Sequence, residues 1–248
     1  MAETRLGHLL TKFKYGKMKL ELCAASIEAI DLAKELNFDR IELCQNLEQG
    51  GMTPSPGFID YAIANGLETH VLIRPRSGGF RYSPKEIEII LRDVRECEAM
   101  GAHGVVVGVL DESDQICKRS LELIMTQAKG MDVTFHRAFD DTYEHEKSLD
   151  VLIEFGLKRV LSAGLARNVE IGLPVLKGMT QYAKGRIEIM TGGGVNLNNI
   201  LKLKNEVKPD AIHFSGTNKT IIDEGSMFSE TILKPNRDKI IRMLNAVR

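Results

Sequence analysis

The chain has 248 residues, which is long for one ordinary domain but normal for a single α/β barrel. With 43% hydrophobic and 27% charged residues, its composition is that of a folded globular protein. The net charge of −1 excludes a bulk basic surface for nucleic acid or an anionic membrane, and no apolar run approaches the roughly 18 residues that a membrane span needs. The N-terminus lacks the apolar segment of a secretory signal, and four cysteines are too few for a disulfide framework, so we expect a cytoplasmic protein.

Residues 1–17 show no hydrophobic period, and we expect them to form an N-terminal arm before a single folded domain at 18–248. Within that domain a strand followed by a helix recurs at spacings of 21 to 35 residues, about the length of a βαβ repeat. The expected strands begin near Lys19, Arg40, Thr69, Gly104, Asp132, Arg159, Arg186 and Ala211.

Local capping signals mark several of the intervening helices. Ser26 precedes an apolar stripe and is predicted to cap the first helix. Residues 83–86, Ser-Pro-Lys-Glu, form a capping box with proline at the first helical position, and Gly101 is expected to end that helix. Asn196 is predicted to cap a later helix, and Pro235 is predicted to begin the last one.

Two later segments are less regular. Residues 165–184 have a helical pattern, but Pro174 lies within it, which predicts a break or a late start. Residues 217–233 lack a helical stripe and contain Gly225, so we interpret them as a candidate lid or subunit contact. Eight strand–helix units favour a single (β/α)8 TIM barrel over the alternative of an open doubly wound sheet.

The expected strands carry unlike residues on their two faces. Residues 19–23 (Lys-Leu-Glu-Leu-Cys) and 40–44 (Arg-Ile-Glu-Leu-Cys) alternate apolar with polar side chains. In a barrel the apolar set faces the surrounding helices and the other set fills the interior. The expected outward set is Leu20, Leu22, Ile41, Leu43, Val71, Ile73, Val133, Phe135, Ile187, Ile189, Ile212 and Phe214. The expected inward set is Glu21, Cys23, Glu42, Cys44, His70, Arg74, Thr134, His136, Glu188, Met190, His213 and Ser215.

This interior is rich in ionisable groups, and two interpretations remain open. Buried charges must be paired, so one interpretation is a structural ion-pair network. Its expected carboxylates are Glu21, Glu42 and Glu188, and its expected bases are Arg74, His136 and His213. The other interpretation is an active site at the carboxyl ends of the strands. There His136 is the best acid–base candidate because imidazole titrates near neutral pH, and Glu42 and Glu21 are the candidate catalytic carboxylates.

Cys23 and Cys44 are expected to end neighbouring parallel strands, whose backbones lie about 4.8 Å apart. Two thiolates that close can bind a soft metal ion such as Cu(I). The alternatives are a disulfide, which is unusual in the cytoplasm, or two small buried residues that fill a barrel layer. Cys97 and Cys117 have no ligand-like neighbours, and we interpret them as structural.

Cationic side chains follow the third and fifth strands. Residues 74–79, Arg-Pro-Arg-Ser-Gly-Gly, place Arg74 and Arg76 at the expected mouth of the barrel. Arginine binds carboxylate or phosphate through paired hydrogen bonds, so both are candidate anion ligands. Arg137, next to His136, is a third.

A glycine loop follows the seventh strand. Gly192, Gly193 and Gly194 lead toward a predicted helix, where free backbone N–H groups favour an anion. Ser215 follows the eighth strand, and the loops after strands seven and eight are the frequent phosphate site of barrels. The alternative is a tight turn that requires glycine for its backbone angles.

These stretches together resemble the CutC copper homeostasis family, in order from residue 20 to about residue 216. The matching residues are Leu20–Cys23, Asp39–Cys44, Gly50–Gly51, Thr53–Ser55, Ile73–Phe80, Tyr82–Ser83, Gly108–Leu110, Val133–Asp140, Arg159–Leu161, Gly192–Val195 and His213. The resemblance implies a barrel fold, a cytoplasmic location and homo-oligomers, either dimers or tetramers. It also implies a role in copper tolerance, with Cu(I) binding proposed at the two strand-end cysteines, Cys23 and Cys44.

Two functions therefore remain open. The first is a copper-handling protein in which Cys23 and Cys44 bind Cu(I) inside the barrel mouth. The second is an enzyme for a small anionic or phosphorylated substrate, held by the arginines and the glycine loop while His136 and Glu42 exchange protons. Neither a nucleic acid nor a membrane is an expected partner.

Overall fold

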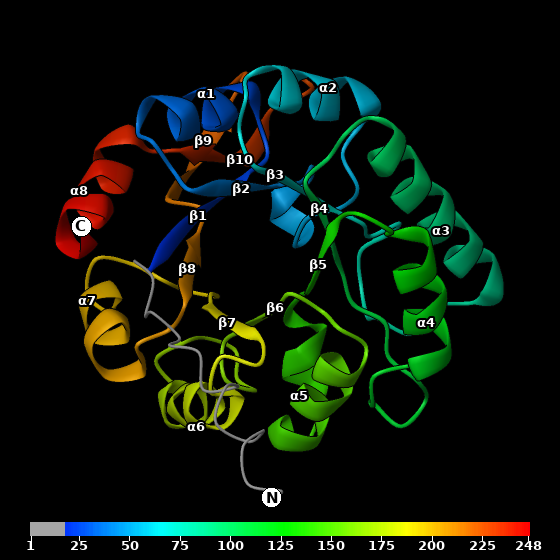
Figure 1. The fold of residues 1–248 in the computed structure, drawn as a ribbon. Coiled ribbons are helices and arrows are strands. Elements are labelled where there is room, and N and C mark those ends of the chain that lie inside the picture. The colour runs from blue at the N-terminus through cyan, green and yellow to red at the C-terminus, as the bar shows by residue number, and fades with distance from the viewer. Residues whose placement is uncertain (1–17) are drawn as a thin grey trace, which may run out of the picture.

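The computed structural model describes residues 18–248, so the predicted arm at 1–17 lies outside the described residues. Eight parallel strands close into a barrel in sequential order, and helices surround them (Figure 1). The strands are β1 (Lys19–Ala24), β2 (Arg40–Leu43), β3 (Thr69–Leu72), β4 (Gly104–Val107), β5 (Asp132–Phe135), β6 (Arg159–Ser162), β7 (Glu188–Thr191) and β8 (Ala211–Phe214). The predicted (β/α)8 TIM barrel is confirmed.

The outer ring of the barrel consists of helices that follow the strands (Figure 1). They are α1 (Ile27–Glu35), α2 (Pro56–Ala64), α3 (Pro84–Ala99), α4 (Lys118–Gln127), α5 (His145–Glu154), α6 (Leu173–Ala183), α7 (Ile200–Lys202) and α8 (Arg237–Val247). Short 3-10 segments, η1 (Leu47–Gln49) and η2 (Arg137–Asp141), follow β2 and β5, and a π-helical segment, η3 (Leu203–Val207), continues α7. Within residues 18–248, no helix has both the length and the apolar character that crossing a membrane would take.

Most element starts agree with the local signals. Every barrel strand except β7 begins at its predicted residue, and β7 begins at Glu188 because Arg186 still belongs to the turn after α6. The Ser26 side chain accepts a hydrogen bond from the Ala29 amide, as a helix cap does. The capping box before α3 is present, and α6 starts late, with its proline in the first turn.

Two predicted helix starts are wrong. Asn196 does not cap the helix after β7, because α7 begins only at Ile200, and the Asn196 amide donates to the Asn199 side chain at 2.8 Å. Pro235 does not begin the last helix, since it ends a strand. The cap of α8 is Asn236, whose side chain accepts from the Lys239 amide at 2.8 Å.

Residues 217–233 fold as most of a β-hairpin outside the barrel. Its strands are β9 (Thr217–Ile222) and β10 (Glu230–Pro235), which pair antiparallel as a separate two-stranded sheet. The Leu233 amide donates to Glu48 of η1 at 2.6 Å, which joins the hairpin to the loop after β2. The missing helical stripe of this segment is therefore explained by strand structure.

The two faces of the strands separate as predicted. All twelve residues of the outward set belong to one hydrophobic cluster between the barrel and the helices. Inside the barrel, the buried apolar residues of 18–248 form two small groups, one around Cys23 and Cys44 and one around Met190. Most of the remaining interior is polar and buried, so the barrel's own charged groups must satisfy one another there.

Candidate functional site

A buried ion network occupies the interior near the start of the strands. The register of β1 places Glu21 beside Arg40 on β2 and His213 on β8. Arg40 Nε donates to the Glu21 carboxylate, and Arg40 Nη2 lies 2.7 Å from Glu188 Oε1. The His213 Nδ1 lies 2.7 Å from Glu21 Oε1. Burial alone raises the pKa of Glu21, but the His213 hydrogen bond and the Arg40 charge hold that pKa far below its usual range.

Arg159 organises the opposite side of this network. Its Nη2 lies 2.9 Å from Asp132 Oδ2, and its Nη1 lies 2.9 Å from His70 Nδ1 and 3.1 Å from Thr134 Oγ1. Guanidinium nitrogens only donate, so His70 accepts at Nδ1 and carries its proton on Nε2, 3.2 Å from Glu68 Oε1. Glu68, His70 and Asp132 lie close enough to hold a metal ion, but these contacts already use their facing atoms.

The predicted network exists, but its bases differ from the expected ones. His213 does contact a carboxylate. Arg74 and His136 form no ion pair among residues 18–248, and Arg40 and Arg159, both completely buried, take their place. Each of these two arginines is the first residue of its strand and has inward parity, so the period of two contained the signal that identifies them.

The two cysteines meet at the carboxyl ends of β1 and β2. The Sγ atoms of Cys23 and Cys44 are 3.7 Å apart, and both thiols are buried and free. Glu42 Oε1 lies 3.8 Å from Cys23 Sγ. Ligand atoms of Cys23, Glu42 and His213 all lie within 4.8 Å of one another. Two thiols, an imidazole and a carboxylate form a donor set that suits a soft or borderline metal ion.

Burial and short contacts shift the pKa values of this group. The hydrogen bond to Cys44, and then burial, raise the pKa of the Cys23 thiol well above its ordinary value. Burial also raises the pKa of Glu42. In His213, burial opposes protonation, but the Glu42 charge and the hydrogen bonds to Cys23 and Glu21 outweigh it and raise the pKa. Glu42 Oε2 is buried with no hydrogen-bond partner among residues 18–248.

His136 lies in a different environment from its predicted carboxylate partners. Its Nδ1 accepts from the Ala138 amide at 3.0 Å, so the proton resides on Nε2, which is buried without a partner among the described residues. Its ring centroid lies 4.8 Å from that of Phe80. Burial, and then the charge of Arg74, lower the pKa of His136 to about 3. No hydrogen bond or ion pair in the described chain joins it to Glu42.

The guanidinium groups of Arg74 and Arg76 are engaged within the protein. Arg74 is buried and donates to three backbone carbonyls at 2.7 to 3.1 Å in the loops after β2 and β3. Those carbonyls belong to Gln49, Gly51 and Gly78. Arg76 pairs with Glu86 at the start of α3 and donates to the Gly79 and Arg81 carbonyls. Both arginines therefore hold loops together, and an anion would compete with these contacts.

The glycine loop after β7 lies against Arg137. A Cβ placed at Gly193 would lie 2.8 Å from Arg137 Cζ, and Gly193 has a φ of 100°, so both packing and backbone angle require glycine. The helix that follows begins at Ile200 and has only three residues, so it supplies no extended helix N-terminus for an anion. Ser215 lies 3.1 Å from the Thr217 hydroxyl at the start of the hairpin.

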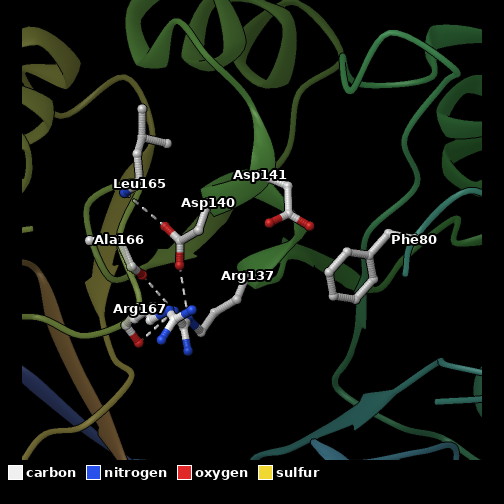
Figure 2. A pocket seen from close by; sticks show the side chains of 7 residues that line it. All are labelled: Phe80, Arg137, Asp140, Asp141, Leu165, Ala166 and Arg167. Carbon is white, nitrogen blue, oxygen red and sulfur yellow. Dashed lines mark hydrogen bonds and ion pairs between the residues drawn. The ribbon is translucent and has the colours of Figure 1, made fainter. Parts of the chain in front are cut away.

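A cavity of about 520 Å³ opens at the carboxyl ends of the strands, and Figure 2 shows the residues around it. Its lining residues are Phe80, Arg137, Asp140, Asp141, Leu165, Ala166 and Arg167. Only Arg137 is a site residue that the sequence had indicated. The others come from three loops and follow no period, so no sequence pattern brings them together.

Known proteins resemble this chain over most of its length. The model of the CutC family matches residues 18–218. A CutC family protein of Bacteroides thetaiotaomicron is 40% identical over 201 residues, covering 80% of this chain and 81% of that protein. One from Vibrio campbellii is 37% identical over 243 residues, covering 92% and 98%. The crystal structure of a Streptococcus agalactiae CutC, named provisionally for copper homeostasis, has a TM-score of 0.75 at 31% identity and covers 79% of this chain and 97% of that one. The chain therefore belongs to the CutC family.

Proposed function

We propose that this chain serves copper homeostasis by binding Cu(I) through Cys23 and Cys44. The observation that carries the proposal is the 3.7 Å separation of two free, buried Sγ atoms. Two sulfurs bound to one tetrahedral metal ion at about 2.3 Å each lie roughly 3.8 Å apart. Thiolates also select Cu(I) over hard cations. Membership of the CutC family and the provisional copper role of the Streptococcus agalactiae relative support the same function.

The neighbouring groups extend this donor set. His213 and Glu42 lie beside Cys23, and Glu42 Oε2 has no other partner among residues 18–248. Because the pKa of the Cys23 thiol is raised, Cu(I) must displace a proton to bind, so affinity decreases as pH falls. We also propose a cytoplasmic location, where the reducing environment keeps both thiols available.

Chelator competition under anaerobic conditions tests the copper site. The native protein should take Cu(I) from a chromogenic chelator. Cys23→Ser and Cys44→Ser should each weaken that binding by more than about tenfold, because a hydroxyl is a poor ligand for a soft ion. Cys117→Ser is the matched control, since the Cys117 thiol contacts Ser120 outside the barrel interior. Equal affinity in all four proteins would remove the proposed site.

A second proposal is an enzyme that acts on a small anionic or phosphorylated substrate. The observation in its favour is His136 Nε2, a buried N–H without a partner among the described residues, close to the barrel mouth. Buried polar atoms are normally satisfied, so such an atom is suited to a ligand. Incubation with a panel of sugar phosphates and hydroxy acids, followed by proton NMR, should show turnover that His136→Gln abolishes and His145→Gln retains. No conversion of any compound by the native protein would reject it.

A further inference from the structure

The mouth cavity has the size and the position of a small-molecule site. Its volume of about 520 Å³ lies within the roughly 300 to 1,000 Å³ that is typical of ligand pockets. Phe80 comes from the loop after β3, Arg137 and Asp141 from η2 after β5, and Arg167 from the loop after β6. All three loops leave the carboxyl ends of barrel strands, where barrels place their active sites.

One cation of this cavity is held rigidly. Arg137 Nε lies 2.8 Å from Asp140 Oδ2, and Arg137 Nη2 donates to the carbonyls of Ala166 at 2.9 Å and Arg167 at 3.2 Å. The backbone of Gly193 packs against the same guanidinium. These contacts use Nε and Nη2, and no hydrogen bond in the described part of the chain involves Nη1. The free edge of a fixed guanidinium is well suited to an anion.

Asp140 fixes the cavity wall and does not face a ligand. Its carboxylate accepts from the Ser162 hydroxyl at 2.5 Å, from the Ala163 amide at 3.0 Å and from the Leu165 amide at 3.1 Å, in addition to Arg137. A carboxylate with this many donors is fully satisfied. Its charge balances that of Arg137, which leaves Arg167 and Asp141 as the uncompensated charges of the lining.

These two charges lie in the wall of one cavity and are free to bind. In Figure 2 the Asp141 carboxylate and the Phe80 ring lie to the right of the two guanidinium groups, with the ring below the carboxylate. The side chains of Arg167 and Asp141 form no hydrogen bond or ion pair with another residue in 18–248. Burial, and then the charges of Asp114 and Asp140, raise the pKa of Asp141. A hydrogen-bond donor at this carboxylate would offset that unfavourable environment.

We propose that this cavity binds a small organic anion, a carboxylate or a phosphate ester, that also carries hydroxyl or amino groups. The anionic group lies on Arg137 Nη1 and Arg167, the hydroxyl or amino groups donate to Asp141, and the carbon skeleton packs on the Phe80 ring. None of these residues belongs to the cysteine site, so this inference stands or fails separately from copper binding. It gives the proposed enzyme a place for its anionic substrate, but it is tested by binding alone and does not require turnover.

Calorimetric titration at low salt tests the proposal with four probes: glycerol 3-phosphate, glycerate, inorganic phosphate and glycerol. The first two compounds combine an anion with hydroxyl groups and distinguish a phosphate from a carboxylate site. At least one of them should bind with a dissociation constant of roughly 1 mM or less, and tighter than inorganic phosphate. Glycerol, which has no charge, should not bind. Failure of both organic anions to bind at this level overturns the proposal.

Substitutions at the two exposed charged residues, Arg167 and Asp141, test the role of each in binding without disturbing the core. Arg167→Ala should weaken the organic anion about five- to tenfold, as expected for a partly exposed charge-assisted contact, and Arg242→Ala on α8 is the matched control. Asp141→Asn should weaken the organic anion but leave inorganic phosphate unchanged or tighter, since a repulsive charge is removed. Native affinity in Arg167→Ala, or parallel changes of both anions in Asp141→Asn, overturns the proposal.

Discussion

At the scale of single residues, the interior of this barrel is stabilised by the fully buried guanidinium groups of Arg40 and Arg159. Arg40 contacts Glu21 and Glu188, and all three side chains are largely or fully buried. Removing one partner of a buried ion pair costs about 3–5 kcal/mol, because the remaining charge is left without compensation. The stability of the barrel therefore depends on each buried charge keeping its partner.

We predict that Arg40→Met lowers the free energy of unfolding by about 3–5 kcal/mol, since it removes the buried positive charge that contacts both Glu21 and Glu188. Urea denaturation measures the change. The control is Arg186→Met, which breaks the exposed pair with Asp150 and should cost less than about 1 kcal/mol. Similar losses in the two variants would show that the buried network contributes no more than a surface pair.

His136 predicts a pH dependence of stability. Burial and Arg74 lower its pKa to about 3, whereas an unfolded histidine titrates near pH 6.5. Between these values the unfolded chain binds a proton that the folded chain rejects, so stability decreases as pH falls from about 6.5 toward 3. The loss approaches about 1.4 kcal/mol per pH unit in the middle of this window.

Unfolding curves of the native protein and of His136→Gln at pH 4, 5, 6, 7 and 8 measure this contribution. Toward low pH the unfolding free energy of the native protein should fall more steeply than that of His136→Gln, and the difference in slope should correspond to nearly one bound proton. Above pH 7 the two curves should run parallel. Parallel curves throughout would mean that folding does not lower the pKa of His136.

At the scale of elements, glycines at both ends of β4 leave space for the histidine rings that follow from the neighbouring strands. Gly108, directly after β4, faces inward, and a Cβ there would lie 2.1 Å from His136 Cε1 and 2.7 Å from Ala138 Cβ. At the other end of the strand, a Cβ placed at Gly104 would lie 2.4 Å from His70 Nδ1. The valines between them cannot relax independently, because they belong to the packed strand.

We predict that Gly108→Ala destabilises the protein by about 1–3 kcal/mol through overpacking against the His136 ring. Gly57→Ala provides a control of opposite sign. Gly57 lies in α2, and apart from its own helix backbone no atom lies within 4 Å of the added Cβ, so the change should stabilise by about 0.5–1 kcal/mol. Thermal melting of both variants checks the pair, and a neutral Gly108→Ala would contradict the close approach.

The sequence predicts the elements that depend on local patterns, and it misses those that depend on the tertiary fold. Strand starts and face assignments were recoverable because they depend on a period of two, and the caps of α1 and α3 depend on a few adjacent residues. The start of α7 was missed because the helix is cut to three residues and continues as a π-helix, which no periodicity signals. The sequence predicts Arg74 as an anion ligand, but its guanidinium donates to carbonyls of two loops that only the tertiary fold brings together.

At the scale of the whole molecule, the β9–β10 hairpin is the part of the described chain that departs from a plain barrel. It stands outside the closed sheet, and its connecting turn carries Met227 and Phe228, which are 95% and 78% exposed. Ile221, on β9, is 56% exposed. Large apolar side chains gathered on one protruding element are typical of a protein contact.

We propose that this hairpin contacts a second copy of the chain, in keeping with the homo-oligomers that the sequence resemblance implies. Sedimentation velocity should then give a native mass well above the 27.6 kDa of one chain. Replacing Met227 and Phe228 together by serine should shift the protein toward the monomer, because the interface loses its apolar anchors. Ile171→Ser, at an exposed apolar residue of the loop before α6, is the control and should leave the mass unchanged. A native protein that sediments as one chain at every concentration, or an assembly that survives the double substitution, would contradict this contact.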